Sequence, residues 1–388
     1  MSGFKKPVVV LGTAVVIAAS FASAHVMAQR FGFGATATPT KVRSVPAEEK
    51  AALFKDPKWK APKTAWGDPD LQGVWTSDDM RSVPMQRPKE FGDRKEMTPE
   101  EFETRAGRDQ AARNRAVNDE SFLRNEWGIR TFGYTSMVID PADGQIPALT
   151  KVGMERTKNQ PRGTYGPGPY NTTADFGLYE RCVTRGVVGS ILPVLYGNGL
   201  RIVQAPGKVV ISYEMIHDTR TIYLDNRPAP DSSIRQYMGL SRGHWDGNTL
   251  VVETTNFKNT TGMGPNGGGT PNSYKLKLTE RFTRIDPDMI NYEVTVDDPV
   301  TYTKPWTFRM TITHQPNYEV YEYSCHEGNS AIRLPLSGER AYDRKVAEAK
   351  AKGLPIPKRE EYGGFKAYAP PSKDTEIYNV NEGKEVEQ

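Results

Sequence analysis

Short stretches in which apolar and polar residues alternate recur through the second half of the chain. In a strand, successive side chains point to opposite faces, so a period of two indicates a β-strand with one buried face. Turn signals such as Ala205-Pro206-Gly207-Lys208 and Asp246-Gly247-Asn248 separate the stretches. The pattern predicts about nine strands, at 200–204, 209–216, 220–224, 236–245, 249–257, 276–284, 290–297, 306–314 and 318–325.

Helical patterns are few. Thr98-Pro99-Glu100-Glu101 combines an N-cap, a proline in the first turn and a capping-box glutamate, which predicts a charged surface helix to about residue 125. A second helix is expected at 339–352, where Gly353 and Pro355 end it. Because short turns join most strands, we expect a mainly β fold, an antiparallel meander that closes into a barrel or sandwich with a few peripheral helices.

The N-terminus has the pattern of a secretory signal. Lys5 and Lys6 precede the uncharged run 8–21, and two small-x-small cleavage options follow at 22–24 and 26–28. We expect cleavage after Ala28, which makes the mature protein periplasmic or secreted. The apolar run is shorter than the roughly 20 residues of a bilayer-spanning helix, so no stable membrane span is expected after cleavage; an uncleaved anchor is the alternative.

Four segments follow from these patterns. We expect the signal peptide at 1–28, an extended lead-in at 29–70, a single β-barrel-like domain at 71–345 and a polar C-terminal tail at 346–388. The helix near 98–125 is an insertion in the domain. The glycine-rich segment Gly262 to Pro271 has no βαβ context for binding phosphate, and we expect it to be a loop over a pocket mouth.

Charge argues against a nucleic-acid partner. The net charge of the whole chain is +4. Removal of 1–28 takes away two lysines and no acidic residue, which leaves +2. Neither a basic excess nor a run of basic residues with interleaved aromatics is present, so a small-molecule ligand is the expected partner. The sequence leaves the oligomeric state open and predicts no nucleotide, flavin or covalent cofactor.

The chain has two cysteines, Cys182 and Cys325. Export sends them to an oxidising compartment, where we expect them to form a disulfide. The alternative is a pair of reduced thiols, one of them reactive or metal-bound. Because neither cysteine belongs to a Cys-x-x-Cys pair, a zinc-ribbon pattern is absent.

Strand alternation assigns the polar candidates to faces. Glu280 shares its face with Leu278 and Phe282, which predicts a carboxylate on the core side, and a buried carboxylate needs a partner or a proton. His217 and His314 each end an apolar row. In a plain meander alternate strands run the same way.

The strand count therefore places His217, His244 and His314 at one end of the barrel and His326 at the other. The three histidines at one end could hold a divalent metal ion with an open position for water. Alternatively one histidine works with a carboxylate in metal-free acid–base chemistry, such as His217 with Asp218 or Glu280, or the histidines are structural. Four further residues are expected to contact a ligand, with the arginine on an anionic group: Tyr213, Arg242, Trp245 and His326.

Two resemblances add to this reading. Gly73-Val74-Trp75 resembles the first-strand motif of lipocalin-like (calycin) barrels. Over roughly 65–345 the chain resembles an uncharacterised family of exported bacterial proteins, which implies a periplasmic setting. The second resemblance rests on the segments 70–75, 214–218 (Glu-Met-Ile-His-Asp), 235–239 (Arg-Gln-Tyr-Met-Gly), 241–252 (beginning Ser-Arg-Gly-His-Trp-Asp-Gly-Asn) and 325–329 (Cys-His-Glu-Gly-Asn).

The sequence thus favours an exported enzyme, of hydrolase or lyase type, that acts on a small, partly apolar molecule in a barrel cavity. Catalysis would use His217, His244 and Glu280, either directly or through a metal. The alternative from another class is a lipocalin-like binding protein for a hydrophobic ligand or haem. A structural envelope protein with a filled core is the third possibility.

Overall fold

The computed structural model describes residues 59–118, 126–159, 169–225, 227–228, 230–315 and 318–359. The predicted signal peptide, its cleavage site and most of the lead-in and tail lie outside these ranges. Within them, no helix combines the length and the apolarity that a bilayer crossing requires.

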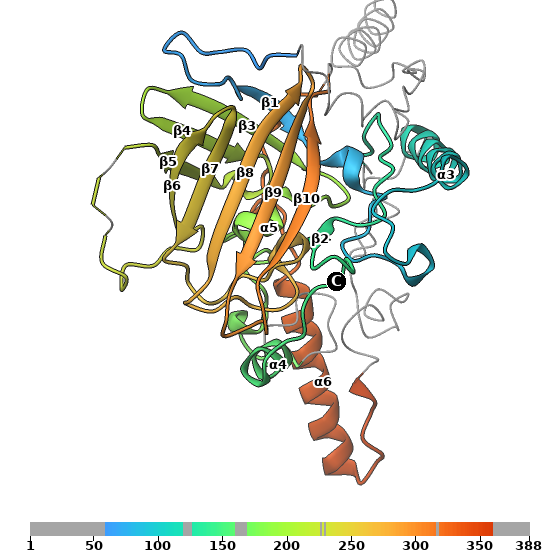
Figure 1. The fold of residues 1–388 in the computed structure, drawn as a ribbon. Helices are drawn as coiled ribbons and strands as arrows, with labels where there is room; N and C mark the ends of the chain where they lie inside the picture. Colours follow the sequence, from blue (N-terminus) through green and yellow to red (C-terminus); the bar gives the residue numbers. More distant parts are fainter. Residues whose placement is uncertain are drawn as a thin grey trace, which may run out of the picture. The chain divides into compact units, whose positions relative to one another are not determined.

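Strands of the described chain form one sheet with the order β1-β3-β4-β5-β6-β7-β8-β9-β10-β2 (Figure 1). An additional pairing of β1 with β10 closes a barrel, and β2 extends the sheet beyond β10. The mainly β, barrel-type fold predicted from the sequence is confirmed. The strands are β1 Gly73–Thr76, β2 Val138–Asp140, β3 Gly199–Ala205, β4 Lys208–Tyr213, β5 Thr219–Tyr223, β6 Leu240–Asp246, β7 Thr249–Thr255, β8 Lys277–Asp286, β9 Met289–Asp297 and β10 Trp306–Thr313.

The barrel departs from a plain meander at β5 and β6, which pair in parallel through Ile222↔Ser241 and Tyr223↔Arg242. A tight turn reverses the chain, but the long connection between β5 and β6 returns it to the end at which β5 began. The remaining neighbours in the barrel pair antiparallel. Every strand from β6 onward therefore runs opposite to the direction that a simple strand count predicts.

The strand predicted at 318–325 is wrong, because this segment lies outside the helices and strands. One edge of β10 pairs with β9, and the other pairs with β2 and β1. Both edges of β10 are therefore occupied, and the segment that follows has no free backbone edge there to extend.

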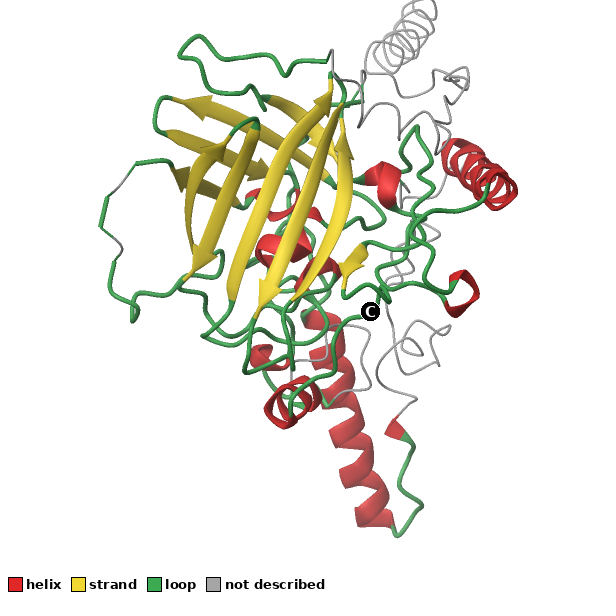
Figure 2. Cartoon of the chain, viewed as in Figure 1, coloured by secondary structure: helices red, strands yellow, loops and turns green. Residues whose placement is uncertain are grey.

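In the view of Figure 2, helices lie to the right of the sheet and below it, and a short helix lies behind the strands. They are α3 Pro99–Asn118, α4 Lys151–Lys158, α5 Gly186–Ile191 and α6 Arg333–Lys352. The predicted capping box is present, since the Thr98 backbone N–H donates to Glu101 at 2.8 Å and the Glu101 N–H donates to the Thr98 hydroxyl at 3.3 Å. The helix at 339–352 begins earlier than predicted, and α4 and α5 were not predicted.

Helix α3 is attached mainly by arginines. Arg105 donates to the backbone oxygens of Phe132 and Tyr134 at 2.9 and 2.6 Å, and Arg113 donates to that of Arg130 at 2.6 Å. Buried carbonyls need such partners, so these contacts hold the charged helix to the segment before β2.

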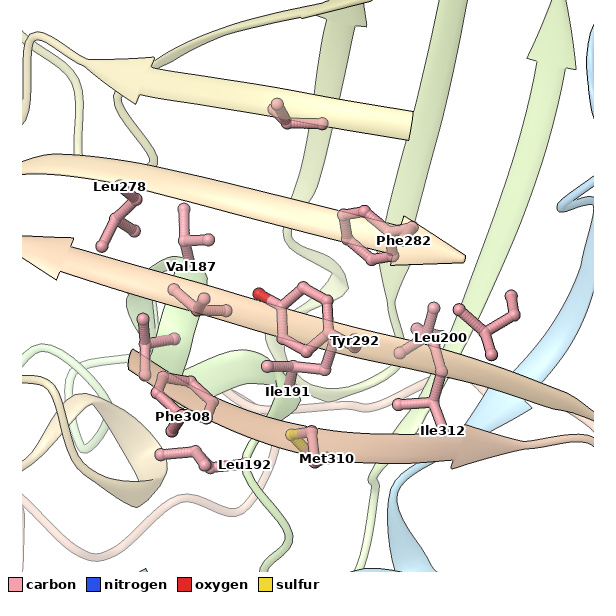
Figure 3. Close-up of a cluster of buried hydrophobic side chains, with 14 of the residues drawn as sticks. Val187, Ile191, Leu192, Leu200, Leu278, Phe282, Tyr292, Phe308, Met310 and Ile312 are labelled. Carbon is pink, nitrogen blue, oxygen red and sulfur yellow. The ribbon is translucent and has the colours of Figure 1, made fainter. Parts of the chain in front are cut away.

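Helix α5 packs inside the barrel. All its residues are buried, and Figure 3 shows Val187 and Ile191 among the inward side chains of β8, β9 and β10. Gly189 allows the close approach, because a Cβ there would lie 2.2 Å from the backbone nitrogen of Gly267. The interior is therefore packed with protein side chains, and open space has to be sought elsewhere.

Candidate functional site

A pocket of about 520 Å³ lies beside the start of β10. It lies between that strand, the segment 81–86, the segment 146–149, the end of α5 and the glycine-rich loop that the sequence placed over a pocket mouth. Its walls are mostly apolar and rich in methionine. The lining residues are Arg81, Val83, Met85, Gln86, Met137, Ile146, Pro147, Ala148, Leu149, Leu192, Pro193, Met263, Gly264, Pro265, Gly269, Thr270, Tyr302 and Trp306.

The closure of the barrel explains why the pocket forms there. β1 is short and meets β10 only through Thr76↔Thr313, at the last residue of each strand. The first half of β10 therefore has β2 as its outer neighbour, through Phe308↔Val138. Residues from loops and from the end of α5, among them Ile146, Leu192 and Met263, line the pocket beside this part of β10.

Arg81 is the one charged side chain in the lining. Its guanidinium stacks over Trp127 at 4.3 Å and donates to the backbone oxygen of Glu126. Burial lowers the pKa of Arg81, while the nearby Asp78 and Glu126 carboxyl groups raise it. A half-buried guanidinium of this kind presents a fixed donor group to the pocket.

Glu126 titrates close to neutral pH. Burial raises its pKa to about 7, and repulsion from Asp78 and Glu214 adds to the rise. A 2.7 Å hydrogen bond from the Gly197 N–H acts in the opposite direction. The Glu126 carboxyl, beside Arg81, therefore changes its charge near neutral pH, as ionisable groups of functional sites often do.

Burial also raises the pKa of the two neighbouring carboxyl groups, Asp78 and Glu214. Their protonated forms are therefore favoured relative to those of exposed carboxyl groups. Asp78 accepts hydrogen bonds from Thr76 and Asn198 at 2.7 and 2.6 Å. Glu214 accepts one from the Tyr318 hydroxyl at 2.7 Å. These partners hold the carboxyl groups in place at the point where β1, β3 and β4 begin or end.

Aromatic rings form part of the pocket wall. Tyr302 and Trp306 pack edge to face with their centroids 5.7 Å apart, and Trp306 is fully buried. The Nε1–H of Trp306 has no hydrogen-bond partner in the structure. A buried donor of this kind usually finds a partner, so the indole N–H of Trp306 is an unsatisfied group in this wall.

The predicted cluster of histidines is wrong, because β4 and β6 run in opposite directions. His217, beyond the end of β4, and His244, near the end of β6, therefore lie at opposite ends of the sheet. His217 and His244 are exposed, and His314, at the end of β10, is partly buried with Nδ1 3.1 Å from the Val74 oxygen. His326 is exposed and follows no strand.

Local backbone explains where His217 points. β4 ends at Tyr213, and a short 3₁₀ turn, Met215–His217, follows. His217 has a positive φ of 55°, so the alternation of the strand no longer assigns its face.

Among the described residues, no group of three or more His, Cys, Asp or Glu side chains is placed to hold a metal ion.

Glu280 faces the core as predicted. It is fully buried and accepts two 2.6 Å hydrogen bonds from Arg220, one of 2.7 Å from the Tyr292 hydroxyl and one of 3.4 Å from Thr254. These donors come from β5, β9 and β7, so the ion pair joins strands across the interior. The sequence did not identify Arg220 as the partner, because β5 and β8 are distant along the chain.

The predicted ligand-contacting residues do not meet at one surface. Tyr213 is buried in the core, where burial raises its pKa to about 12. Trp245 packs on the core, whereas Arg242 lies three positions earlier on β6 and so points to the opposite face. None of these three, nor His326, lines the pocket.

The predicted disulfide is confirmed: Cys182 and Cys325 are bonded. The bond joins the segment before α5 to the segment before α6. It also brings together Tyr179 and Tyr323, whose hydroxyl oxygens lie 3.4 Å apart.

Sequence reasoning missed Arg81, Glu126 and Trp306 as site residues. The two charged residues lie in stretches without strand or helix periodicity, and Trp306 has the pattern of a core residue. The apolar, glycine-containing run Gly186–Ile191 was a usable signal for a short buried helix next to a cavity. Comparison with protein-family models, with curated proteins and with solved structures finds no match for this chain.

Proposed function

We propose that the protein binds a small, largely apolar organic molecule in the pocket beside β10, with a polar or anionic group of the ligand at Arg81. The observation that carries the proposal is the composition of the pocket: apolar and methionine-rich walls around a single cation. Its volume of about 520 Å³ falls in the range of small-molecule sites, roughly 300–1,000 Å³.

The donors suit a ligand with an acceptor at one end. Arg81, Gln86 and Trp306 belong to the lining, and the Nε1–H of Trp306 has no hydrogen-bond partner. Flexible methionines, here Met85, Met137 and Met263, adapt to apolar ligands of different shapes. The pocket therefore suits a ligand whose apolar part can vary in shape and whose polar part makes a directional hydrogen bond.

Binding is favoured over catalysis by what the lining lacks. The described residues that line the pocket include no carboxylate, histidine, cysteine or serine. His217, His244 and Glu280, the groups that the sequence favoured for catalysis, are also outside the lining. General acid–base catalysis requires such a group within hydrogen-bond reach of the substrate.

An acid–base enzyme that uses the same pocket is the second candidate. It is favoured by Glu126, whose pKa of about 7 is suited to proton transfer and whose backbone is bonded to Arg81. For either function we propose that the protein acts after export, on the basis of the signal pattern at 1–28.

The binding proposal is tested with an anionic, aromatic fluorescent probe, 8-anilinonaphthalene-1-sulfonate. Ala148 is exposed and lines the pocket, so Ala148→Trp should obstruct the pocket without disturbing the core and weaken probe binding by at least about tenfold, equivalent to 1.4 kcal/mol. Arg81→Met should weaken it about 10- to 100-fold, the value of one charge-assisted hydrogen bond. Ala142→Trp, at an exposed alanine outside the lining, is the control.

Equal probe binding in wild type, Ala148→Trp and Ala142→Trp would refute the assignment of the pocket. To separate the two candidates, a ligand found by this assay is incubated with wild type and Glu126→Gln. Turnover by wild type that is lost in Glu126→Gln while binding persists would favour the enzyme.

A further inference from the structure

Arg185 is a fully buried cation without a partner. Arg185 directly precedes α5 in the chain and is 0% exposed. None of its three guanidinium nitrogens has a hydrogen-bond partner in the structure. Burial lowers the pKa of Arg185 to about 10, so the group remains charged at neutral pH. A buried charge is normally paired and hydrogen-bonded, because its desolvation costs several kcal/mol.

Three tyrosines interact electrostatically with this guanidinium: Tyr179, Tyr196 and Tyr323. The hydroxyl group of an ordinary tyrosine carries no charge at neutral pH. Burial raises the pKa of Tyr179 and of Tyr196, which keeps both hydroxyls protonated. The tyrosines therefore contribute hydroxyl groups around Arg185 but leave its charge uncompensated.

The disulfide assembles this cluster. Tyr179 lies three residues before Cys182, and Tyr323 lies two residues before Cys325. The ring of Tyr196 stacks on that of Tyr323 with centroids 6.4 Å apart. The three tyrosines are partly exposed, so the cluster extends from the buried guanidinium to the surface.

We propose that Arg185, with the hydroxyls of Tyr179, Tyr196 and Tyr323, binds a small oxyanion, in the first place a carboxylate. A guanidinium with all its nitrogens free presents a planar fork that matches a carboxylate or a phosphate through two parallel hydrogen bonds. Neutral tyrosine hydroxyls add donors without adding repulsion. Tyr323 belongs to the irregular segment that follows β10 and is partly exposed.

The proposal is independent of the pocket at Arg81. The experiment measures the thermal unfolding midpoint of the full-length oxidised protein in acetate, phosphate or sulfate, each against chloride at equal ionic strength. An anion at 100 times its dissociation constant should raise the midpoint by roughly 5 °C. A response to acetate indicates a carboxylate site, and a response to phosphate alone indicates a phosphate site.

Arg185→Met should abolish the anion-specific rise. Its midpoint in chloride should equal or exceed that of wild type, because the substitution removes an uncompensated buried charge. Arg81→Met should keep the full response, which separates this site from the pocket. If Arg185→Met fails to fold, Arg185→Lys and Tyr323→Phe replace it, and each should weaken the response severalfold through loss of the fork or of one donor.

Two results would overturn the proposal. One is a wild-type midpoint that is the same in all four salts. The other is an anion-specific rise that persists in the Arg185 variants, which would locate the bound anion elsewhere.

Discussion

Glu126→Gln tests the electrostatics beside the pocket. Burial and two neighbouring carboxyl groups raise the pKa of Glu126 from 4.5 to about 7. At 1.36 kcal/mol for each pKa unit, this difference corresponds to about 3 kcal/mol. Glutamine is similar in size to glutamate and keeps an oxygen that can accept the hydrogen bond from Gly197, so the substitution removes the charge with little change in shape.

The sign of the effect follows from proton binding. Because the folded protein holds the Glu126 proton more tightly than the unfolded chain, this carboxyl reduces stability as pH rises from about 4.5 to 7. Below that range both states are protonated, and above it the loss is complete. Glu126→Gln should therefore leave the free energy of unfolding unchanged at pH 4 and raise it by up to about 3 kcal/mol at pH 8.

The assay is urea unfolding of wild type and variant at pH 4, 6 and 8, with the difference in unfolding free energy taken at each pH. Glu103→Gln, at an exposed position of α3, is the control and should change stability little at any pH. A Glu126→Gln effect that is the same at pH 4 and pH 8 would refute the reasoning. So would destabilisation at pH 8, since it would mean that the ionised carboxylate is stabilised in the fold.

Two further predictions concern the core and the helix inside the barrel. Glu280→Gln should lower the free energy of unfolding in urea by about 3–5 kcal/mol, because Arg220 is left charged and buried. The double variant Arg220→Met, Glu280→Met should lower it by less than either single change. A loss below 1 kcal/mol in the single variant would contradict this. Gly189→Ala should destabilise by about 1–3 kcal/mol, because its Cβ would meet the backbone of Gly267, while Gly107→Ala, in open space on α3, should stabilise by about 0.5–1 kcal/mol. Equal midpoints for the two alanine variants in thermal unfolding would rule out the close packing of α5.

The inward position of Glu280 was predictable, but its role was not. Alternation along β8 places Glu280 between Leu278 and Phe282 on the buried face, and this is what the structure has. Its partner Arg220 comes from β5, three strands away in the sheet. Which buried groups meet across a barrel depends on closure and register, and local periodicity contains no information about either.

The histidines show the same limit. Each of His217, His244 and His314 follows or ends a strand region close to where the sequence predicted one. Their distribution between the two ends depends on the parallel pairing of β5 with β6, which a long connection permits and a turn motif does not reveal. One unexpected strand direction was enough to separate His217 from the other two.

The candidate site was largely invisible in the sequence for a related reason. Arg81, Leu149, Leu192 and Trp306 come from four separate parts of the chain, and they share a surface because β1 meets β10 at a single residue pair. Of the lining, only the glycine-rich loop carried a recognisable signal.

The sequence by itself determined the features that arise from neighbouring residues: most strands, the Thr98–Glu101 cap, the face of Glu280 and, through the chemistry of two lone cysteines, the disulfide. The tertiary structure alone decided the parallel pair, the entry of α5 into the barrel, the pocket at Arg81 and the isolation of Arg185. The first group depends on backbone periodicity and hydrogen bonds within a few residues. The second depends on which distant segments compete for the same sheet edge and the same interior space, and that competition is settled only when the whole chain packs.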